Sequence, residues 1–394
     1  MSTGRPPHTA RRPASGWAFA GVAVTSFGGP LALAALYAPG IVSGAAASAG
    51  LAMVAAVAVF AVPLAIWLRY SGQVAGSGGL YSFVEAAAGR RVALLQAGLW
   101  IVSYLLYLLF TTAQIVYDTL PAVLPGERPW QPLLEIAIPV ALAGVMIAGR
   151  RVTLVVTGLL AAGQLAIAGA LGGVTLTHLG TPVSSFGASA PAGTLATATS
   201  QTALLYICGS LPLFLGGELA RPARTIRRGL TATYLLSAVV ITAAVAPLAA
   251  DPAVTRSPIP GMALAERFAG HGFALVVGVG VAVSVGGVML VEYLALSRLV
   301  HAVTSWPLRP LIIAIGAAIV VVAPFTLLNP ERIYNALLKP SLVALWLSQL
   351  IVFAVYPRFV ARQGGRRLPA WGLAAAASAF AIYGLWATIH HSSS

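Results

Sequence analysis

The sequence predicts an all-α membrane protein with about eleven transmembrane helices, built from two inverted five-helix repeats and one extra helix. Three observations carry this prediction. Of the 394 residues, 59% are hydrophobic and only 8% are charged, apolar runs recur along the whole chain, and basic residues gather in alternate gaps between them. A soluble chain carries about a quarter charged residues, and a spanning helix needs roughly 20 apolar residues. The bilayer is therefore the expected solvent.

The apolar runs divide the chain into four parts. Residues 1–16 are basic and proline-rich, which predicts a disordered cytoplasmic segment. The first five-helix repeat is expected at 17–178, the second at 199–356, and the extra helix at 369–388. The predicted spans are 17–37, 47–69, 92–120, 132–148, 152–177, 199–219, 229–249, 271–300, 308–328, 334–356 and 369–388.

The basic residues predict the orientation. If the N-terminus is cytoplasmic, the outer side holds five of the 23 basic residues and the cytoplasmic side holds the rest, as the positive-inside rule requires. These five are Arg128, Arg256, Arg267, Arg332 and Lys339. We expect a multi-pass protein of the plasma (inner) membrane with an extracytoplasmic C-terminus. The net charge of +14 does not indicate nucleic-acid binding, because no basic helix face with interleaved aromatic residues is present.

Gly/Pro clusters interrupt spans 1 and 6 at matching places. Span 1 contains Ser26–Pro30 (SFGGP) and span 6 contains Cys208–Pro212 (CGSLP), and Gly29 and Gly209 are 180 residues apart. The same offset relates the ends of other paired spans, and five helices followed by five must have opposite orientations. Matching interruptions in two inverted halves are the best sequence pointer to a transporter site. A plain kink in each helix is the alternative.

Each break is expected to end one half-helix and to start another at Pro30 or Pro212, because proline suits a first helical position. The new N-termini would favour a carboxylate. The unpaired carbonyls that end the first half-helices, near Val24, Thr25, Tyr206 and Ile207, would favour an ammonium group. The predicted substrate-binding residues are Thr25, Ser26, Gly28, Gly29, Tyr206, Cys208, Gly209 and Ser210. Neither break contains a charged side chain, so a small or apolar neutral amino acid is expected.

Several segments resemble the amino acid/polyamine/organocation (APC) transporter superfamily and its amino acid permeases. The segments are Gly78–Val84 (GGLYSFV) followed by Gly89–Arg91, then Gly217–Arg228 with its acidic residue before Arg-Pro, and Ser297–Leu299 at the end of span 8. The resemblance implies a leucine-transporter-like inverted repeat with substrate at the unwound parts of helices 1 and 6.

The resemblance leaves the coupling ion open between H⁺ and Na⁺. Many proton-coupled members of the superfamily carry a lysine in helix 5, where this chain has Gln164. Ser284 in span 8 would supply a hydroxyl to a cation site beside helix 1, as in sodium-coupled relatives. Glu292 should face the protein interior or water and act as a proton carrier, because a membrane-buried carboxylate is costly. The alternative is that it reaches the cytoplasmic surface or pairs with a basic group.

The function expected from the sequence is secondary active amino-acid transport by alternating access, with no cofactor. Polyamines or other organic amines, and export or exchange in place of uptake, are the alternatives, and the oligomeric state is open. No nucleotide-binding P-loop is present, and no catalytic constellation supports an intramembrane enzyme. A metal-ion transporter of related fold would put an Asp in the first break and a Met or His in the second, and both are absent from these breaks.

Overall fold

The structure is a computed structural model that describes residues 13–126, 128–180, 183–249 and 251–390. Within these ranges the chain is helical, apart from turns and one isolated parallel β-bridge between Ala14 and Leu219. Ten helical segments are long and apolar enough to cross a membrane. The predicted fourth span is the shorter helix α8, whose 17 residues reach roughly 26 Å. The prediction of an all-α membrane protein is confirmed.

The helices follow the predicted spans closely. Spans 1 to 5 consist of α1 (Gly16–Ser26), α2 (Pro30–Ala32), η1 (Leu33–Tyr37) and α3 (Ala38–Ser43); η2 (Ala46–Ser48) and α4 (Ala49–Ser71); α6 (Arg90–Ala113), η3 (Gln114–Thr119) and α7 (Leu120–Val123); α8 (Gln131–Ile147); and α9 (Arg150–Leu179). Spans 6 to 11 consist of α10 (Ala192–Leu204) and η5 (Ile207–Glu218); α11 (Pro222–Leu248); α14 (His271–Thr304); α15 (Leu308–Val322) and η6 (Ala323–Leu328); α16 (Pro330–Arg362); and α17 (Arg367–His390). The connections hold α5 (Leu80–Ala88), η4 (Val183–Phe186), α12 (Pro252–Thr255) and α13 (Pro260–Ala269).

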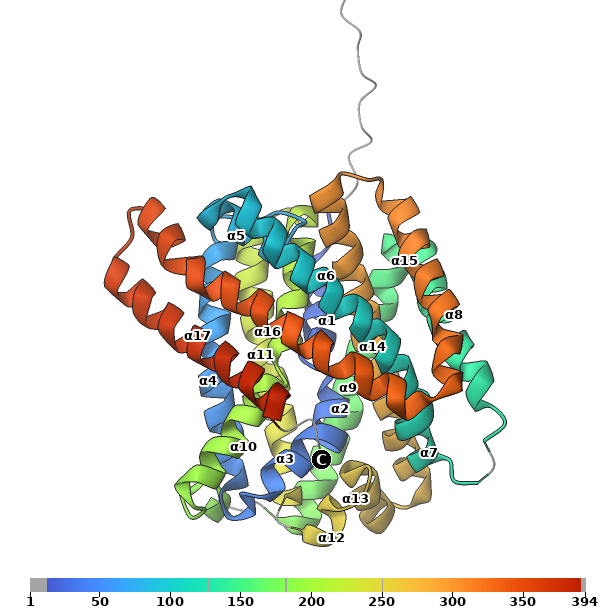
Figure 1. Cartoon of the computed structure of the whole chain (residues 1–394). Helices are drawn as coiled ribbons and strands as arrows, with labels where there is room; N and C mark the ends of the chain where they lie inside the picture. Colours follow the sequence, from blue (N-terminus) through green and yellow to red (C-terminus); the bar gives the residue numbers. More distant parts are fainter. Residues whose placement is uncertain (1–12, 127, 181–182, 250, 391–394) are drawn as a thin grey trace, which may run out of the picture.

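Spans 1, 6 and 8 form the centre of the molecule. The most apolar stretch of span 1 is 83% buried and those of spans 6 and 8 are 72% buried, whereas spans 5 and 9 bury only 33%. Span 1 packs against α9, α11, α14 and η5, and α6 and α16 cross the molecule together with α17 packed on α16 (Figure 1). The central position of the two interrupted spans puts both breaks where a ligand would be enclosed.

The break in span 1 agrees with its prediction. Helix α1 ends at Ser26, and α2 begins with Pro30. Between them Gly28 and Gly29 have φ values of +70° and +66°, a left-handed conformation that residues with a Cβ adopt at a cost of about 1–2 kcal/mol.

The break in span 6 lies earlier than predicted. Helix α10 ends at Leu204, and a 3₁₀-helix (η5) of 12 residues begins at Ile207, so Pro212 lies inside the second half and does not start it. The early restart is visible in the backbone, where the Gly209 amide donates to the Tyr206 carbonyl at 2.9 Å. This bond has the i to i+3 pattern of a 3₁₀-helix. Runs longer than three or four residues are uncommon in this conformation and often mark a functional hinge.

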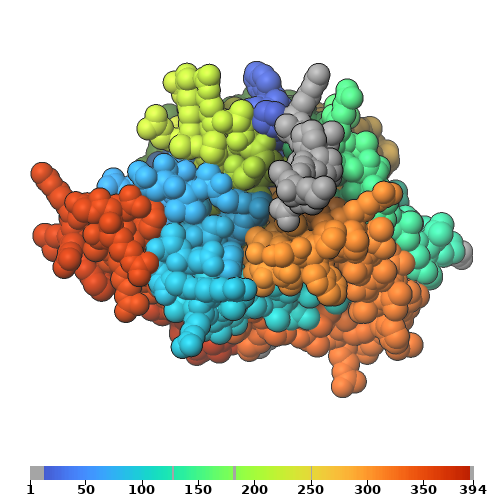
Figure 2. Space-filling model, turned by 90° about the horizontal axis from the view of Figure 1, so that it is seen from above, coloured from blue at the N-terminus to red at the C-terminus, as the bar shows by residue number. Residues whose placement is uncertain are grey.

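The described part of the N-terminal segment contacts the rest of the fold from Ala14 on. The Ala14 amide donates to the Glu218 carbonyl at 2.8 Å, and the Ser15 hydroxyl caps α1. The predicted disordered segment therefore does not reach residue 16, and residues 1–12 lie outside the described residues. These contacts lie at the end of the molecule where α9, α11 and α15 begin (Figure 2). We call it the arginine-rich end. The division into repeats at 17–178 and 199–356 and the membrane orientation stay predictions.

Candidate functional site

The two helix breaks face each other. A Cβ on Gly28 would lie 3.0 Å from the Leu205 carbonyl oxygen, and one on Gly209 would lie 2.3 Å from the Phe27 ring. Gly28, Leu205 and Cys208 keep part of their surface uncovered, although helices surround them. The break residues then point in three different directions, so the predicted substrate set does not form a single cluster.

One direction leads to an aromatic cluster of Phe27, Phe60, Tyr206 and Tyr234. The Phe27 ring lies 6.4 Å from the Tyr206 ring and 5.3 Å from the Tyr234 ring, and Phe60 lies 5.7 Å from both tyrosines. Gly209 leaves room for Phe27. Tyr206 and Gly209 thus pack the two breaks against spans 2 and 7.

A second direction leads to a junction of spans 1, 5 and 8, here called the glutamine junction (Thr25, Gly29, Gln164 and Ser284). The Ser284 hydroxyl donates to Gln164 Oε1 at 2.8 Å and accepts from the Ala32 amide at 3.3 Å. A Cβ on Gly29 would lie only 2.4 Å from Ser284 Oγ. Gln164 Nε2 and Thr25 Oγ1 are buried without a hydrogen-bond partner among the described residues. The sequence candidates Gln164 and Ser284 therefore meet at the first break.

The third direction leads to a buried acid, in the Glu292 cluster (Glu292, Cys208, Tyr104 and Tyr107). Glu292 is fully buried on α14, and its Oε1 lies 3.7 Å from the Cys208 thiol at the second break. Its Oε2 has no hydrogen-bond partner among the described residues. Tyr104 and Tyr107 on α6 are near enough to interact electrostatically with the carboxyl group. One carboxyl group and two phenol rings thus surround the side chain of Cys208.

The remaining predicted site residues are satisfied elsewhere. The Ser26 hydroxyl donates to the Ala23 carbonyl within its own helix at 2.8 Å. The Ser210 hydroxyl accepts from Gln349 on α16 at 3.5 Å, so Ser210 points toward span 10. Serine in a helix commonly bonds its own backbone, which is the outcome for Ser26.

The carbonyls that were expected to be free at the breaks accept local hydrogen bonds. Val24 accepts from the Phe27 amide, Thr25 from the Gly29 amide and Tyr206 from the Gly209 amide, at 3.3, 3.1 and 2.9 Å. Ile207 accepts from the Ser210 hydroxyl at 3.5 Å. The breaks are closed by short turns, and the expectation of unpaired carbonyls at these four residues is wrong.

At the arginine-rich end, Glu218 holds three spans together. Arg298 Nε on α14 donates to Glu218 Oε1 at 2.6 Å, and Arg150 Nη1 on α9 lies 3.4 Å from Glu218 Oε2. The backbone of Glu218 also receives the Ala14 amide, so the start of span 1 meets this network. The network thus joins the starts of spans 1 and 5 to the ends of spans 6 and 8.

Replacing Glu218 by Gln should cost about 3 kcal/mol of folding free energy. The Arg298 side chain is only 4% exposed, and breaking a buried ion pair by removing one partner leaves an uncompensated charge. Chemical or thermal unfolding of the purified protein measures the loss. Glu266→Gln, which disrupts an exposed pair with His271, is the control and should cost less than about 1 kcal/mol. Equal effects of the two substitutions would contradict the role given to Glu218.

Sequence reasoning missed two features of the site. It treated Cys208 as part of the break and Glu292 as a separate proton carrier, whereas their side chains are in contact. It also overlooked Gln349 on α16, whose Oε1 is buried without a partner among the described residues. An amide inside an otherwise apolar span is a signal that could have drawn attention to Gln349.

Comparison with known proteins identifies the fold. The chain is similar to the structure of MhsT in complex with L-phenylalanine, with a TM-score of 0.66 and 13% identity over 96% of this chain and 99% of that one. It is also similar to a mutant of the manganese transporter of Eremococcus coleocola (TM-score 0.64, 11% identity, 98% and 90% coverage). The same transporter bound to an aromatic bis-isothiourea compound gives a TM-score of 0.63 at 11% identity, with 99% and 91% coverage.

No protein-family model matches the chain, and no curated protein sequence is significantly similar to it. At these low identities the structural similarities establish the fold alone. Membership of the APC superfamily, suggested by the sequence segments, stays a prediction. The chain has the leucine-transporter-like fold of multi-pass membrane proteins, with helices 1 and 6 discontinuous, as the sequence predicted.

Proposed function

We propose that this protein is a secondary transporter of small organic amines, which binds the ammonium group of its substrate at Glu292. The observation that carries the proposal is the fully buried carboxyl group beside the second break, with one oxygen unpaired among the described residues. A buried carboxylate needs a counter-charge or a proton. A protonated amine supplies both a positive charge and hydrogen-bond donors.

The surroundings of Glu292 suit a cation. Tyr104 and Tyr107 offer phenol rings, which attract ammonium groups, and Tyr104 is held by stacking on Trp100 at 3.7 Å between ring centroids. The prediction of a neutral substrate considered only residues inside the breaks. Because Glu292 comes from span 8, its charge adds to the site and shifts the preference toward a cationic substrate.

The first break offers little to a carboxylate. Pro30 has no N–H, the Gly29 amide donates to Thr25 and the Ala32 amide donates to Ser284. The Leu31 amide is the remaining N–H group at the start of this half-helix, where an anion is expected to bind. An amine without a carboxylate is therefore favoured over an amino acid, although the similarity to MhsT in complex with L-phenylalanine keeps amino acids as the second candidate.

A metal ion is disfavoured as the substrate. Among the described residues, no group of three or more His, Cys, Asp or Glu side chains is placed to hold a metal ion. Cys208 and Glu292 alone provide two ligands, whereas protein sites for transition metals commonly use three or four. The similarity to the manganese transporter thus extends to the fold, and the metal is tested below as a competing ligand.

The two breaks support alternating access as the proposed mechanism, because each provides a point at which a central span can bend. Spans 1 and 6 lie at the centre, each with a hinge: the glycine pair in span 1 and the Leu205–Tyr206 turn before η5 in span 6. The Glu218 network closes the arginine-rich end, so release there requires its ion pairs to separate. Substrate would reach Glu292 from the opposite side, past Tyr107 and past Tyr37, whose hydroxyl accepts from Gln114.

The glutamine junction favours transport that does not need sodium. A sodium site uses free oxygen lone pairs, but the Ser284 hydroxyl already joins Gln164 and the Ala32 amide. Gln164 adds an NH₂ group, a donor that would repel a cation. At Glu292 an incoming ammonium can exchange with a proton and leave the charge of the enclosed site unchanged. Proton exchange is therefore the proposed coupling.

Replacing sodium by potassium in the assay buffer should leave amine uptake within about twofold of its original rate. Uptake should rise when the interior of the vesicles is made more acidic than the outside, since an outward proton gradient then drives exchange. Radiolabelled uptake into proteoliposomes of the purified protein measures both. A strict need for sodium would refute the role given to the glutamine junction.

A matched series of compounds tests the proposed function. Ethylamine is alanine without the carboxylate, and propionate is alanine without the ammonium group. Isopentylamine and isocaproate stand in the same relation to leucine and form a larger series. Counterflow in proteoliposomes should occur with an amine and fail with the acids. If the amino acids are transported and the amines are not, the substrate class is amino acids and not organic amines. If only the carboxylic acids are transported, the proposed ammonium site is disproved.

A further inference from the structure

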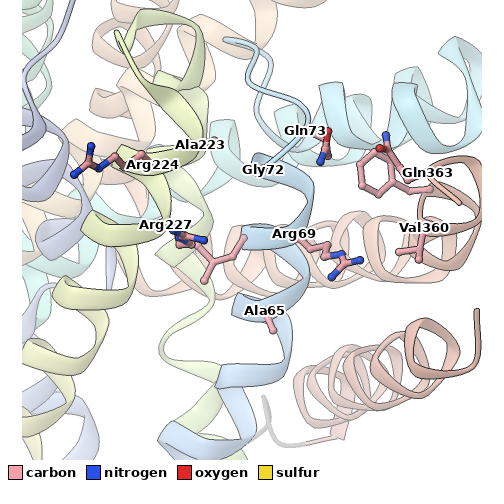
Figure 3. A pocket seen from close by; sticks show the side chains of 11 residues that line it. Ala65, Arg69, Gly72, Gln73, Ala223, Arg224, Arg227, Val360 and Gln363 are labelled. Atoms are coloured by element: carbon pink, nitrogen blue, oxygen red, sulfur yellow. The ribbon is translucent and has the colours of Figure 1, made fainter. Parts of the chain in front are cut away.

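A groove at the arginine-rich end lies outside the proposed transport path. It has a volume of about 810 Å³ and lies between α4, α11 and α16. Its lining includes Arg69, Arg224 and Arg227 together with the amides of Gln73 and Gln363, and no Asp or Glu (Figure 3). The three guanidinium groups come from two helices that pack side by side.

The three arginines make no ion pair or hydrogen bond within the described residues. Arg224 and Arg227 stand on the first turns of α11, with the Arg224 side chain directed away from Arg69 in Figure 3. Arg69 stands on the last turn of α4, turned toward α16. Positive charges that line one groove without a carboxylate repel one another. An anion between them removes this repulsion and gains hydrogen bonds from the guanidinium groups.

The remaining lining of the groove is apolar. Ala65 and Leu68 lie on α4 below Arg69, and Phe359 and Val360 lie on α16. A soluble anion would gain nothing from these side chains, whereas a phospholipid could place its phosphate among the arginines and an acyl chain along the apolar residues. The position of the groove along the spans also suits a phospholipid headgroup. The groove lies where α4 ends and α11 begins, at the boundary of the apolar spans.

We infer that this groove binds the headgroup of an anionic phospholipid. Basic pockets between transmembrane helices on the cytoplasmic side are suited to anionic headgroups. The N-terminal residues 1–12 are a poor alternative occupant, since they contain three arginines and no acidic residue. A bound lipid would join spans 2, 7 and 10, and it would act on a part of the fold that the proposed amine site does not use.

Thermal unfolding of the full-length protein in detergent, titrated with phosphatidylglycerol, phosphatidylcholine or inorganic phosphate, tests the inference. Phosphatidylglycerol should raise the Tm, while phosphatidylcholine and phosphate at the same concentration should not. In the double variant Arg69→Gln/Arg227→Gln the apparent affinity for phosphatidylglycerol should fall by on the order of twentyfold, at about fivefold for each arginine. In each single variant the apparent affinity for phosphatidylglycerol should fall about fivefold. The single variants therefore preserve the test if the double variant is unstable.

The matched control is the double variant Arg228→Gln/Arg309→Gln. Both residues are exposed at the same end, and neither lines the groove. This control should bind phosphatidylglycerol within twofold of the parent protein. Equal losses in the two double variants would mean general charge attraction and overturn the site. Protection by inorganic phosphate equal to that by the lipid would overturn the choice of a phospholipid as the ligand.

Discussion

The substitution Glu292→Gln should reduce amine transport at least a hundredfold while the protein stays folded. Glutamine keeps the size of the side chain and its contact with Cys208, but it removes the negative charge that balances the ammonium group. Losing one partner of a buried charge pair at a binding site costs about 2–5 kcal/mol, and about 3 kcal/mol corresponds to a hundredfold. Proteoliposome uptake gives the rate, and the Tm of the purified variant reports folding.

The folded stability of this variant should equal or exceed that of the parent protein, because glutamine is neutral at a fully buried position without having to hold a proton. Glu135→Gln is the matched control. Glu135 is also fully buried, but it lies on α8 and accepts a hydrogen bond from Thr326, away from the breaks. Its substitution should leave transport within about threefold of the parent. Unchanged transport by Glu292→Gln would remove the basis for the proposed ammonium site.

The substitution Gly29→Ala should destabilise the protein by at least about 2 kcal/mol and abolish transport. A Cβ at this position would lie 2.4 Å from Ser284 Oγ and 3.2 Å from both the Ser284 carbonyl and Gln164 Oε1. The backbone φ of +66° adds strain, at about 1–2 kcal/mol for a residue with a Cβ. The hydrogen bonds that join spans 1, 5 and 8 would be forced apart. Thermal unfolding and uptake measure the two effects.

Two control substitutions separate the contributions. Gly163→Ala in α9 is helical with open space around it, and it should be neutral or slightly stabilising. Gly89→Ala has a positive φ of +88° and also open space, so it should show the backbone strain alone. Combining Gly29→Ala with Ser284→Ala should recover part of the stability, because the nearest clashing atom is removed. If Gly29→Ala has the same effect as Gly163→Ala, the close packing of Gly29 against Ser284 and Gln164 does not exist.

The sequence predicted the positions of the helices well, because each span must bury its own backbone hydrogen bonds and present about 20 apolar residues to lipid. It also predicted the break in span 1, where two glycines and a proline leave few other conformations. The break in span 6 was misplaced to Pro212. A proline is tolerated in the interior of η5 as well as at a helix start, so its position alone does not locate the break.

The directions of the side chains at the breaks could not be predicted. Residues next to one another, such as Cys208 and Gly209, face a buried acid and an aromatic cluster respectively. The rotation of each half-helix decides this, and tertiary packing sets that rotation. The contact between Cys208 and Glu292 joins residues 84 apart in the sequence. The residues around the second break therefore gave no sign that the site would include a carboxyl group. Gln164 and Ser284 were separate candidates through the family resemblance, and their hydrogen bond was not predicted.

The most direct test of the central claim is a thermal-stability screen of the detergent-purified protein against amines, amino acids, carboxylic acids and Mn²⁺. A ligand that binds only the folded state raises the Tm. The account predicts that at least one organic amine raises the Tm of the parent protein, and that the same amine has no effect on the Glu292→Gln variant. A Tm increase with Mn²⁺ or with carboxylic acids, and none with any amine, would contradict it.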